Sequence, residues 1–229
     1  MHTIALLAQK GGTGKTTLAL HFAVEAMRQG ARVAIVDADI QQSATKWASR
    51  RDAAEPIVVK TIPAGDVPLP DVLSLCREDS RSHVFIDTMP RVENQALEVM
   101  KLATFAVLPT APSPVDIEAL EPTVALVSRV GIPACIVLNN CRPGSNVNNQ
   151  AARVLEGYGL PICPVHIFRR AVMADAFTDG RAVIELEPEG KAAWEVARAW
   201  RWISEQIGDE RKPQRRNIKA SQRRDTVTL

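Results

Sequence analysis

The stretch Gln9-Lys10-Gly11-Gly12-Thr13-Gly14-Lys15-Thr16-Thr17 follows an apolar run at residues 4–8 and precedes a helical pattern at residues 18–28. A strand, a glycine-rich loop and a helix in this order form the usual context of a phosphate-binding loop. Glycines let backbone N–H groups approach phosphate oxygens, and the start of the helix adds partial positive charge. The stretch therefore predicts a nucleotide site at the start of an α/β fold.

The side chains of this loop have predicted roles. The Lys15 ammonium is expected to contact the β- and γ-phosphates, and the Thr16 hydroxyl is expected to bind Mg²⁺. The generic motif begins with glycine where this chain has Gln9. A glycine-rich turn that binds nothing is the alternative, and the ordered lysines, glycines and threonines argue against it. The predicted nucleotide-binding residues of the loop are Gly11, Gly12, Thr13, Gly14, Lys15, Thr16 and Thr17.

Carboxylates end two further predicted strands. Residues 31–36 read as a buried strand that leads into Asp37-Ala38-Asp39, and Val84-Phe85-Ile86-Asp87 has the apolar run and final aspartate of a Walker B strand. Carboxyl ends of parallel strands meet at one edge of a sheet, which is where ligands bind. Asp87 is therefore predicted to hold Mg²⁺ directly or through water. Capping of the following helix is the alternative role for Asp37 and Asp39.

The segment from Lys10 to Thr17 resembles the deviant Walker A box of the ParA/MinD family of ATPases, and the resemblance covers residues 1–207 in motif order. Residues 37–41 are similar to the family's D-x-D-P-Q box, with Ile40 in place of proline. Residues 87–90 and 109–116 are similar to its Walker B segment and its P-x-x-P-S-P-x-D loop. The resemblance implies a doubly wound, mostly parallel β-sheet flanked by helices, the P-loop NTPase fold.

The resemblance also implies an Mg²⁺-dependent ATPase that converts ATP to ADP and phosphate. In the family the extra lysine, here Lys10, reaches across a dimer interface to the nucleotide of the partner subunit. The resemblance makes Asp39 the residue that orients or deprotonates the attacking water and places Asp37 near Mg²⁺. An asparagine that follows residues 134–138 binds the adenine edge in the family, which selects Asn139; an asparagine in a turn is the alternative. The implied catalytic residues are Lys10, Lys15 and Asp39, and the implied metal ligands are Thr16, Asp37 and Asp87.

Charge is unevenly distributed along the 229 residues. The formal net charge is +2, yet residues 209–229 carry seven Lys/Arg against three Asp/Glu. We expect an ATPase domain over residues 1–207 and a basic segment, 208–229, that is disordered unless bound. Basic side chains also mark the predicted final helix, 189–207, where they alternate with two tryptophans. The candidate DNA contacts are Arg169, Arg170, Arg198, Arg201, Arg215 and Arg216, although solvated arginines or packing against a neighbouring helix would explain the same pattern.

Composition restricts the location of the chain. The four cysteines form no C-x-x-C pair, which fits reduced thiols in a cytoplasmic protein. No apolar run reaches the roughly 18 residues of a membrane span. We therefore expect a cytoplasmic, nucleoid-associated protein without stable membrane association.

These features predict a short plasmid-partition ParA ATPase. ATP would hold two subunits in a sandwich dimer that binds DNA without reading sequence, and a ParB-like or small centromere-binding protein would stimulate hydrolysis and release. One alternative is the positioning of a non-DNA cargo on the nucleoid. A MinD-like membrane-cycling ATPase would need an amphipathic carboxyl-terminal helix, whereas residues 220–229 are polar. A metabolic enzyme similar to dethiobiotin synthetase, which has a similar loop, would need a small carboxylate substrate.

Overall fold

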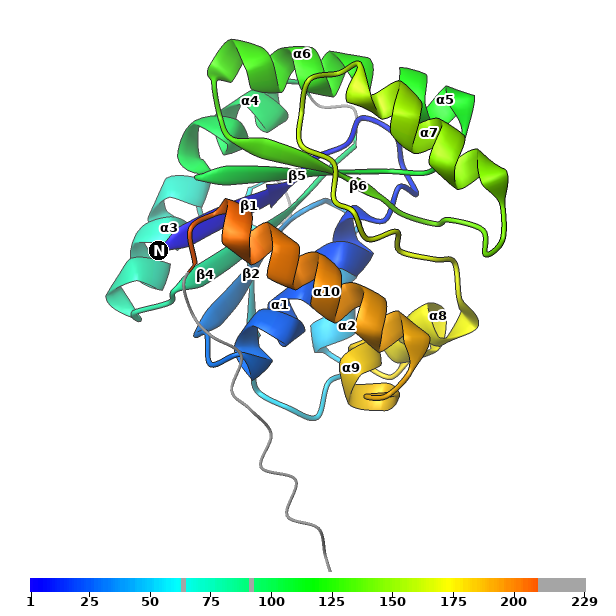
Figure 1. Cartoon of the computed structure of the whole chain (residues 1–229). Helices are drawn as coiled ribbons and strands as arrows, with labels where there is room; N and C mark the ends of the chain where they lie inside the picture. The colour runs from blue at the N-terminus through cyan, green and yellow to red at the C-terminus, as the bar shows by residue number, and fades with distance from the viewer. Residues whose placement is uncertain (63–64, 91–92, 210–229) are drawn as a thin grey trace, which may run out of the picture.

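The computed structural model describes residues 1–62, 65–90 and 93–209. Across these residues, six parallel strands form one sheet in the order β3-β2-β4-β1-β5-β6 (Figure 1). The strands are β1 (His2–Leu6), β2 (Val33–Ala38), β3 (Ile57–Lys60), β4 (His83–Thr88), β5 (Phe105–Thr110) and β6 (Ala134–Leu138). The predicted doubly wound, parallel α/β fold is confirmed.

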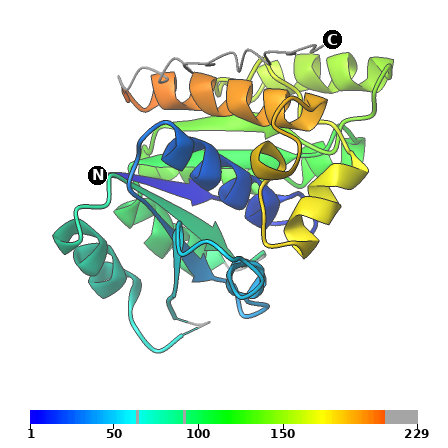
Figure 2. The same ribbon diagram turned by 90° about the horizontal axis from the view of Figure 1, so that it is seen from below.

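Helices cover both faces of the sheet (Figures 1 and 2). One layer contains α1 (Lys15–Arg28), α2 (Ser43–Ala48), α8 (Ala171–Thr178), α9 (Val183–Leu186) and α10 (Lys191–Gln206). The other contains α3 (Leu69–Glu78), α4 (Glu93–Leu102), α5 (Pro114–Glu118), α6 (Glu121–Val130) and α7 (Asn146–Glu156). Successive residues of a strand face opposite layers, so Ile4 and Leu6 pack in the first core and Ala5 in the second. No helix of the described residues is long and apolar enough to cross a membrane.

Two sequence-based expectations differ from the structure, and proline explains both. The apolar residues among 161–166 predict a last short strand, but the structure has only an isolated bridge there, Ile136↔Ile162. Pro161 and Pro164 have no N–H to continue a ladder. The sequence also predicts one helix from Asp116 to about residue 129, whereas the structure divides this stretch into α5 and α6. Pro122 would clash with the carbonyl four residues earlier in a continuous helix, and it is instead accommodated in the first turn of α6.

The central strands bring the predicted acidic groups to the phosphate loop. β1 lies between β4 and β5, and its last residue, Leu6, is in register with Asp87. On the other side of β4, Asp87 is in register with Asp37. The loop after β1 therefore leaves the sheet beside both carboxylates, at the carboxyl ends where α/β sheets bind ligands.

Candidate functional site

The loop between β1 and α1 has a backbone that only glycine adopts without strain. Gly12 and Gly14 have φ values of 77° and 96°, in the left-handed region. A Cβ atom on Gly14 would also lie 2.0 Å from the amide nitrogen of Asn139. That amide nitrogen donates a 2.7 Å hydrogen bond to the Thr13 carbonyl, so the end of β6 holds the loop in place.

Lys15, Thr16 and Asp87 form a polar cluster beneath the loop, in which Lys15 and Asp87 are buried and Thr16 is half-buried. Lys15 is only 7% exposed, and burial lowers the pKa of its ammonium while the Asp87 and Asp39 carboxylates oppose that shift. The Thr16 hydroxyl donates a 2.6 Å hydrogen bond to Asp87 Oδ2. Burial raises the pKa of Asp87 to about 7, against the lowering effect of the Thr16 hydrogen bond. A cation beside Asp87 would restore its ionised form.

The cluster fits Mg²⁺ and a triphosphate. Among the described residues, Asp87 Oδ1 and the Thr13 hydroxyl are buried side-chain oxygens without a hydrogen-bond partner. Buried polar groups of this kind are usually satisfied, so a ligand or hydrated ion is the natural partner. Carboxylate and hydroxyl oxygens are ligands that Mg²⁺ prefers. Thr16 and Asp87 are therefore suited to hold the ion directly or through water.

The two aspartates after β2 have different surroundings. Asp37 Oδ2 accepts hydrogen bonds of 2.8 Å from both the backbone N–H and the hydroxyl of Thr45, and Oδ1 accepts one of 3.2 Å from the Asp39 N–H. Asp37 thus caps the first turn of α2, the alternative role given above, while its place as a metal ligand stays a prediction. Asp39 Oδ1 accepts a 2.9 Å hydrogen bond from the Gln41 N–H, and Asp39 lines a cavity beside the phosphate loop.

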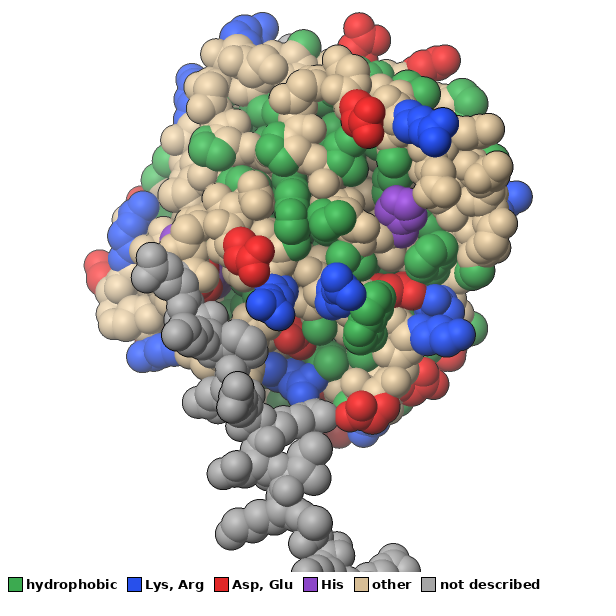
Figure 3. Space-filling model, in the orientation of Figure 1, with side chains coloured by type: hydrophobic (Ala, Val, Ile, Leu, Met, Phe, Trp, Pro, Cys, Tyr) green, Lys and Arg blue, Asp and Glu red, His purple; other side chains and the backbone are tan. Residues whose placement is uncertain are grey.

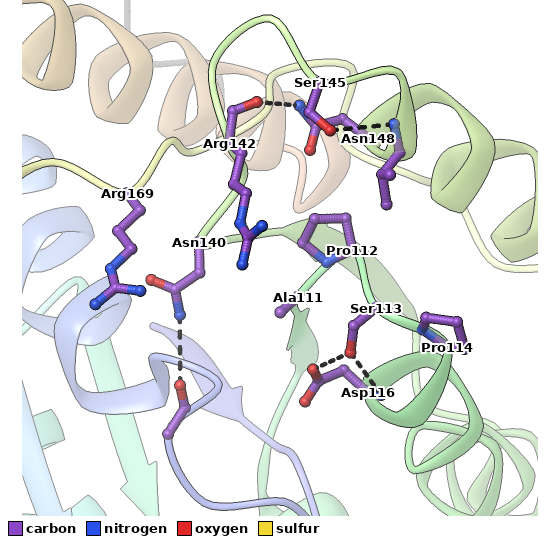
Figure 4. Close-up of a pocket in the computed structure, with 12 residues that line it drawn as sticks. Ala111, Pro112, Ser113, Pro114, Asp116, Asn140, Arg142, Ser145, Asn148 and Arg169 are labelled. Atoms are coloured by element: carbon purple, nitrogen blue, oxygen red, sulfur yellow. Dashed lines mark hydrogen bonds between the residues drawn. The ribbon is translucent and has the colours of Figure 1, made fainter.

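Two neighbouring cavities open at this edge of the sheet. The first, of about 600 Å³, brings together the phosphate loop, Asp39, Asn139 and side chains of α8 such as Phe177. The second, of about 630 Å³, lies between the loop after β5 and the segment after β6 (Figure 4). Gly12, Asn140 and Arg169 line both cavities. A ligand held in the first cavity therefore shares part of its wall with the second.

Lys10 lies outside the lining of the first cavity. Its ammonium is 2.5 Å from Asp116 Oδ1, and the Lys10 side chain is 38% exposed. The Ser113 hydroxyl donates to the Asp116 carboxylate, and the Asp116 N–H donates to Ser113 Oγ at 3.2 Å (Figure 4). The sequence did not predict the ion pair between Lys10 and Asp116.

Asn139 and Asn140 both contact the phosphate loop. Asn139 is 4% exposed and holds Thr13, as described above. Asn140 has a φ of 55° and donates a weak 3.4 Å hydrogen bond to the Gly12 carbonyl (Figure 4). The loop contacts of these two asparagines had no signal in the sequence beyond the asparagine pair itself. The adenine contact of Asn139 stays a prediction.

The candidate DNA-contacting arginines differ in the contacts that their side chains already make within the chain. Arg170 Nη2 is 2.5 Å from Glu195 Oε1, and this ion pair gives Arg170 a structural role that needs no DNA. The Arg198 guanidinium lies 4.6 Å from the ring centre of the exposed Trp194. Arg201 is 69% exposed and has a 3.4 Å contact with Glu205.

Arg169 lines both cavities and is shown in Figure 4. Lys and Arg side chains lie among hydrophobic and acidic ones over the surface that α10 occupies (Figure 3). Arg215 and Arg216 lie outside the described residues. DNA contact by any of the six arginines stays a prediction.

Comparison with known proteins identifies the family of this chain. Residues 4–183 match the model of the CobQ/CobB/MinD/ParA nucleotide binding domain. The chain is 33% identical over 208 residues to the maintenance of carboxysome distribution protein A of Gloeobacter kilaueensis, covering 89% of this chain and 93% of the relative. It is 27% identical over 203 residues to the protein of the same name from Halothiobacillus neapolitanus, covering 83% and 90%.

The fold is shared with solved structures of low sequence identity. The septum site-determining protein MinD of Pyrococcus horikoshii, complexed with Mg-ADP, superposes with a TM-score of 0.72 at 17% identity, over 90% of this chain and 97% of that one. The chain therefore belongs to the CobQ/CobB/MinD/ParA nucleotide-binding family and is a ParA/MinD-type member of that family of ATPases.

Proposed function

We propose that this chain hydrolyses Mg²⁺-ATP in a homodimer that binds DNA without reading its sequence, and that it uses this cycle to distribute a cargo over the nucleoid. The position of Lys10 carries the proposal. Lys10 belongs to the phosphate loop but does not line the first cavity, which Lys15 lines. Its ammonium instead pairs with Asp116. We infer that Lys10, from this position, contacts the nucleotide of a second copy.

The residues of the site divide the work of phosphoryl transfer. Lys15 and the Lys10 of the facing copy neutralise charge that develops on the γ-phosphoryl group. Thr16 and Asp87 hold Mg²⁺, which adds charge neutralisation when bound. Asp39 positions the attacking water from the cavity wall, and residues 88–90 respond to the loss of the γ-phosphate. Each nucleotide then contacts both subunits, so hydrolysis lets them separate.

The relatives favour a protein assembly over plasmid DNA as the cargo. Both relatives described above are named for maintaining carboxysome distribution and match the chain along most of its length. We therefore place the alternative of a non-DNA cargo ahead of plasmid partition. In either case, a cargo-bound partner protein stimulates hydrolysis. Imaging a strain that lacks the protein decides between the two, because loss of even spacing would affect either the assembly or the plasmid.

Nucleotide-dependent DNA binding is the first prediction. We expect tight binding to non-specific duplex DNA with ATP and weak binding with ADP or no nucleotide, measured by fluorescence anisotropy at several salt concentrations. Because phosphate contacts release counterions, the affinity falls steeply with salt. Combining Arg198→Ala with Arg201→Ala should reduce the slope of log K against log salt by about 2 if each arginine neutralises a phosphate.

Arg153→Ala is the matched control, since Arg153 is exposed on α7 in the opposite helix layer. It should leave the slope unchanged. Equal DNA binding with and without ATP would remove the switch from the proposal. Binding to anionic vesicles in place of DNA would favour the membrane-cycling alternative.

The Lys10–Asp116 ion pair gives a second prediction. Lys10→Ala should leave ATP binding by the single subunit intact but prevent the ATP-dependent dimer. Asp116→Asn should release Lys10 in both subunits and favour dimerisation about 5- to 30-fold, as expected for two partly exposed ion pairs of ~0.5–1 kcal/mol each. Light scattering across a protein concentration series with ATP measures both effects. A dimer weakened by Asp116→Asn would mean that Asp116 acts in the assembled dimer instead.

A further inference from the structure

Three side chains that commonly bind metals meet at the sheet edge opposite the nucleotide site. His2 begins β1 and His83 begins β4, and the two residues are in register between these neighbouring strands. Asp209 follows the end of α10. One ligand atom from each residue lies within 4.8 Å of the other two. Two imidazoles and one carboxylate thus converge from three elements that are distant in the sequence.

His83 is oriented as a metal ligand would be. Its side chain is fully buried, and its ring lies edge-on to Trp200 with centroids 5.6 Å apart. Its Nε2 atom is 3.1 Å from Asp209 Oδ2, while its Nδ1 atom is 3.3 Å from the Ser82 hydroxyl. Metal-binding histidines usually have the second ring nitrogen hydrogen-bonded, which fixes the ring.

The end of α10 fixes the position of Asp209. Gly208 has a φ of 73°, and its N–H donates to the Glu205 carbonyl at 3.3 Å. The Asp209 N–H donates to the Ser204 carbonyl at 2.9 Å. These two bonds form a Schellman motif, which ends the helix in a defined geometry. The Asp209 carboxylate, only 12% exposed, is therefore directed at His83 by backbone geometry.

We propose that His2, His83 and Asp209 bind a divalent transition-metal ion, and that Zn²⁺ suits the site best. Zn²⁺ accepts two imidazoles and a carboxylate, with water completing a tetrahedral shell, whereas Mg²⁺ and Ca²⁺ prefer oxygen ligands only. The ion would fasten the end of α10 to the sheet, directly before the basic residues 211–229. The site is remote from the phosphate loop, so this inference stands independently of the proposed function.

Zinc binding to the full-length protein without a histidine tag tests the proposal. Excess Mg²⁺-ADP is added to occupy the nucleotide site, so that the Zn²⁺ counted is not bound there. Equilibrium dialysis with elemental analysis then counts the bound Zn²⁺. We expect one high-affinity Zn²⁺ per chain and a higher thermal unfolding midpoint with Zn²⁺, because an ion that binds only the folded state stabilises it. His2→Gln and Asp209→Asn should each weaken binding about tenfold or more and reduce the thermal shift.

His166→Gln is the matched control, since it removes a histidine outside the cluster. It should bind Zn²⁺ as the unmodified protein does, and circular dichroism checks that each variant is folded. Co²⁺ in place of Zn²⁺ should give visible bands without strong thiolate absorption, which excludes the cysteines as ligands. Absence of stoichiometric binding, or unchanged affinity in both His2→Gln and Asp209→Asn, would overturn the proposal and leave a hydrogen-bonded contact.

Discussion

Replacing Lys15 with alanine is expected to abolish ATP binding at physiological nucleotide concentrations. Lys15 is almost fully buried, and its ammonium faces the carboxylates of Asp87 and Asp39. Its loss removes the buried positive charge beside Asp87 and Asp39 and leaves these acidic groups facing the triphosphate. Truncating one partner of a buried charge pair costs about 2–5 kcal/mol, which is roughly a 30- to 5,000-fold loss of affinity.

Isothermal titration with a slowly hydrolysed ATP analogue and Mg²⁺ measures this loss. Lys101→Ala is the matched control, because Lys101 is exposed on α4 and lines neither cavity. It should bind ATP with unchanged affinity. If Lys15→Ala stayed within about threefold of the unmodified protein, the phosphate-binding role assigned to Lys15 would be wrong.

Replacing Asp39 is expected to separate binding from hydrolysis. Asp39→Ala should bind ATP and dimerise, but its kcat should fall by about 10²- to 10⁴-fold, the range typical for loss of a group that accepts a proton from the attacking water. Single-turnover phosphate release measures the chemical step, and light scattering with ATP measures the dimer. The predicted product is therefore a stable, ATP-bound dimer that remains on DNA.

Asp39→Asn distinguishes the charge of Asp39 from its effect on the loop. Its amide oxygen can still accept the 2.9 Å hydrogen bond from the Gln41 N–H, so the turn is retained while the carboxylate is lost. We expect Asp39→Asn to be as slow as Asp39→Ala. Asp52→Asn, at an exposed position, should hydrolyse ATP normally. Normal turnover by Asp39→Asn would assign the water to another residue.

Much of the fold was predictable because its signals are local. Strands such as residues 134–138 are short apolar runs that end in polar residues, and the structure places β6 at those same residues. The errors came from proline. Pro122 divides α5 from α6, and the prolines around residues 161–164 reduce an expected strand to an isolated bridge. Proline decided both features, because it has no backbone N–H to donate and its ring clashes with the preceding turn of a helix.

The site was predictable only in part. Lys15, Thr16 and Asp87, which the motifs predict to share a site, do lie together, because strand register brings the end of β4 to the phosphate loop. The surroundings of Asp37 did not follow from its motif, since Thr45 occupies one of its oxygens. The domain division at residue 207 stays a prediction. The properties of residues 210–229 also stay predictions, because these residues lie outside the described part.

The sequence by itself determined the phosphate loop, since strand, glycines, lysine and helix are contiguous and each acts through its own backbone geometry or charge. Only the tertiary structure decided that Lys10 pairs with Asp116 and that His2, His83 and Asp209 converge. These contacts join residues that are far apart in the chain. Their distances depend on which strands are neighbours and where helices end, which no short segment specifies.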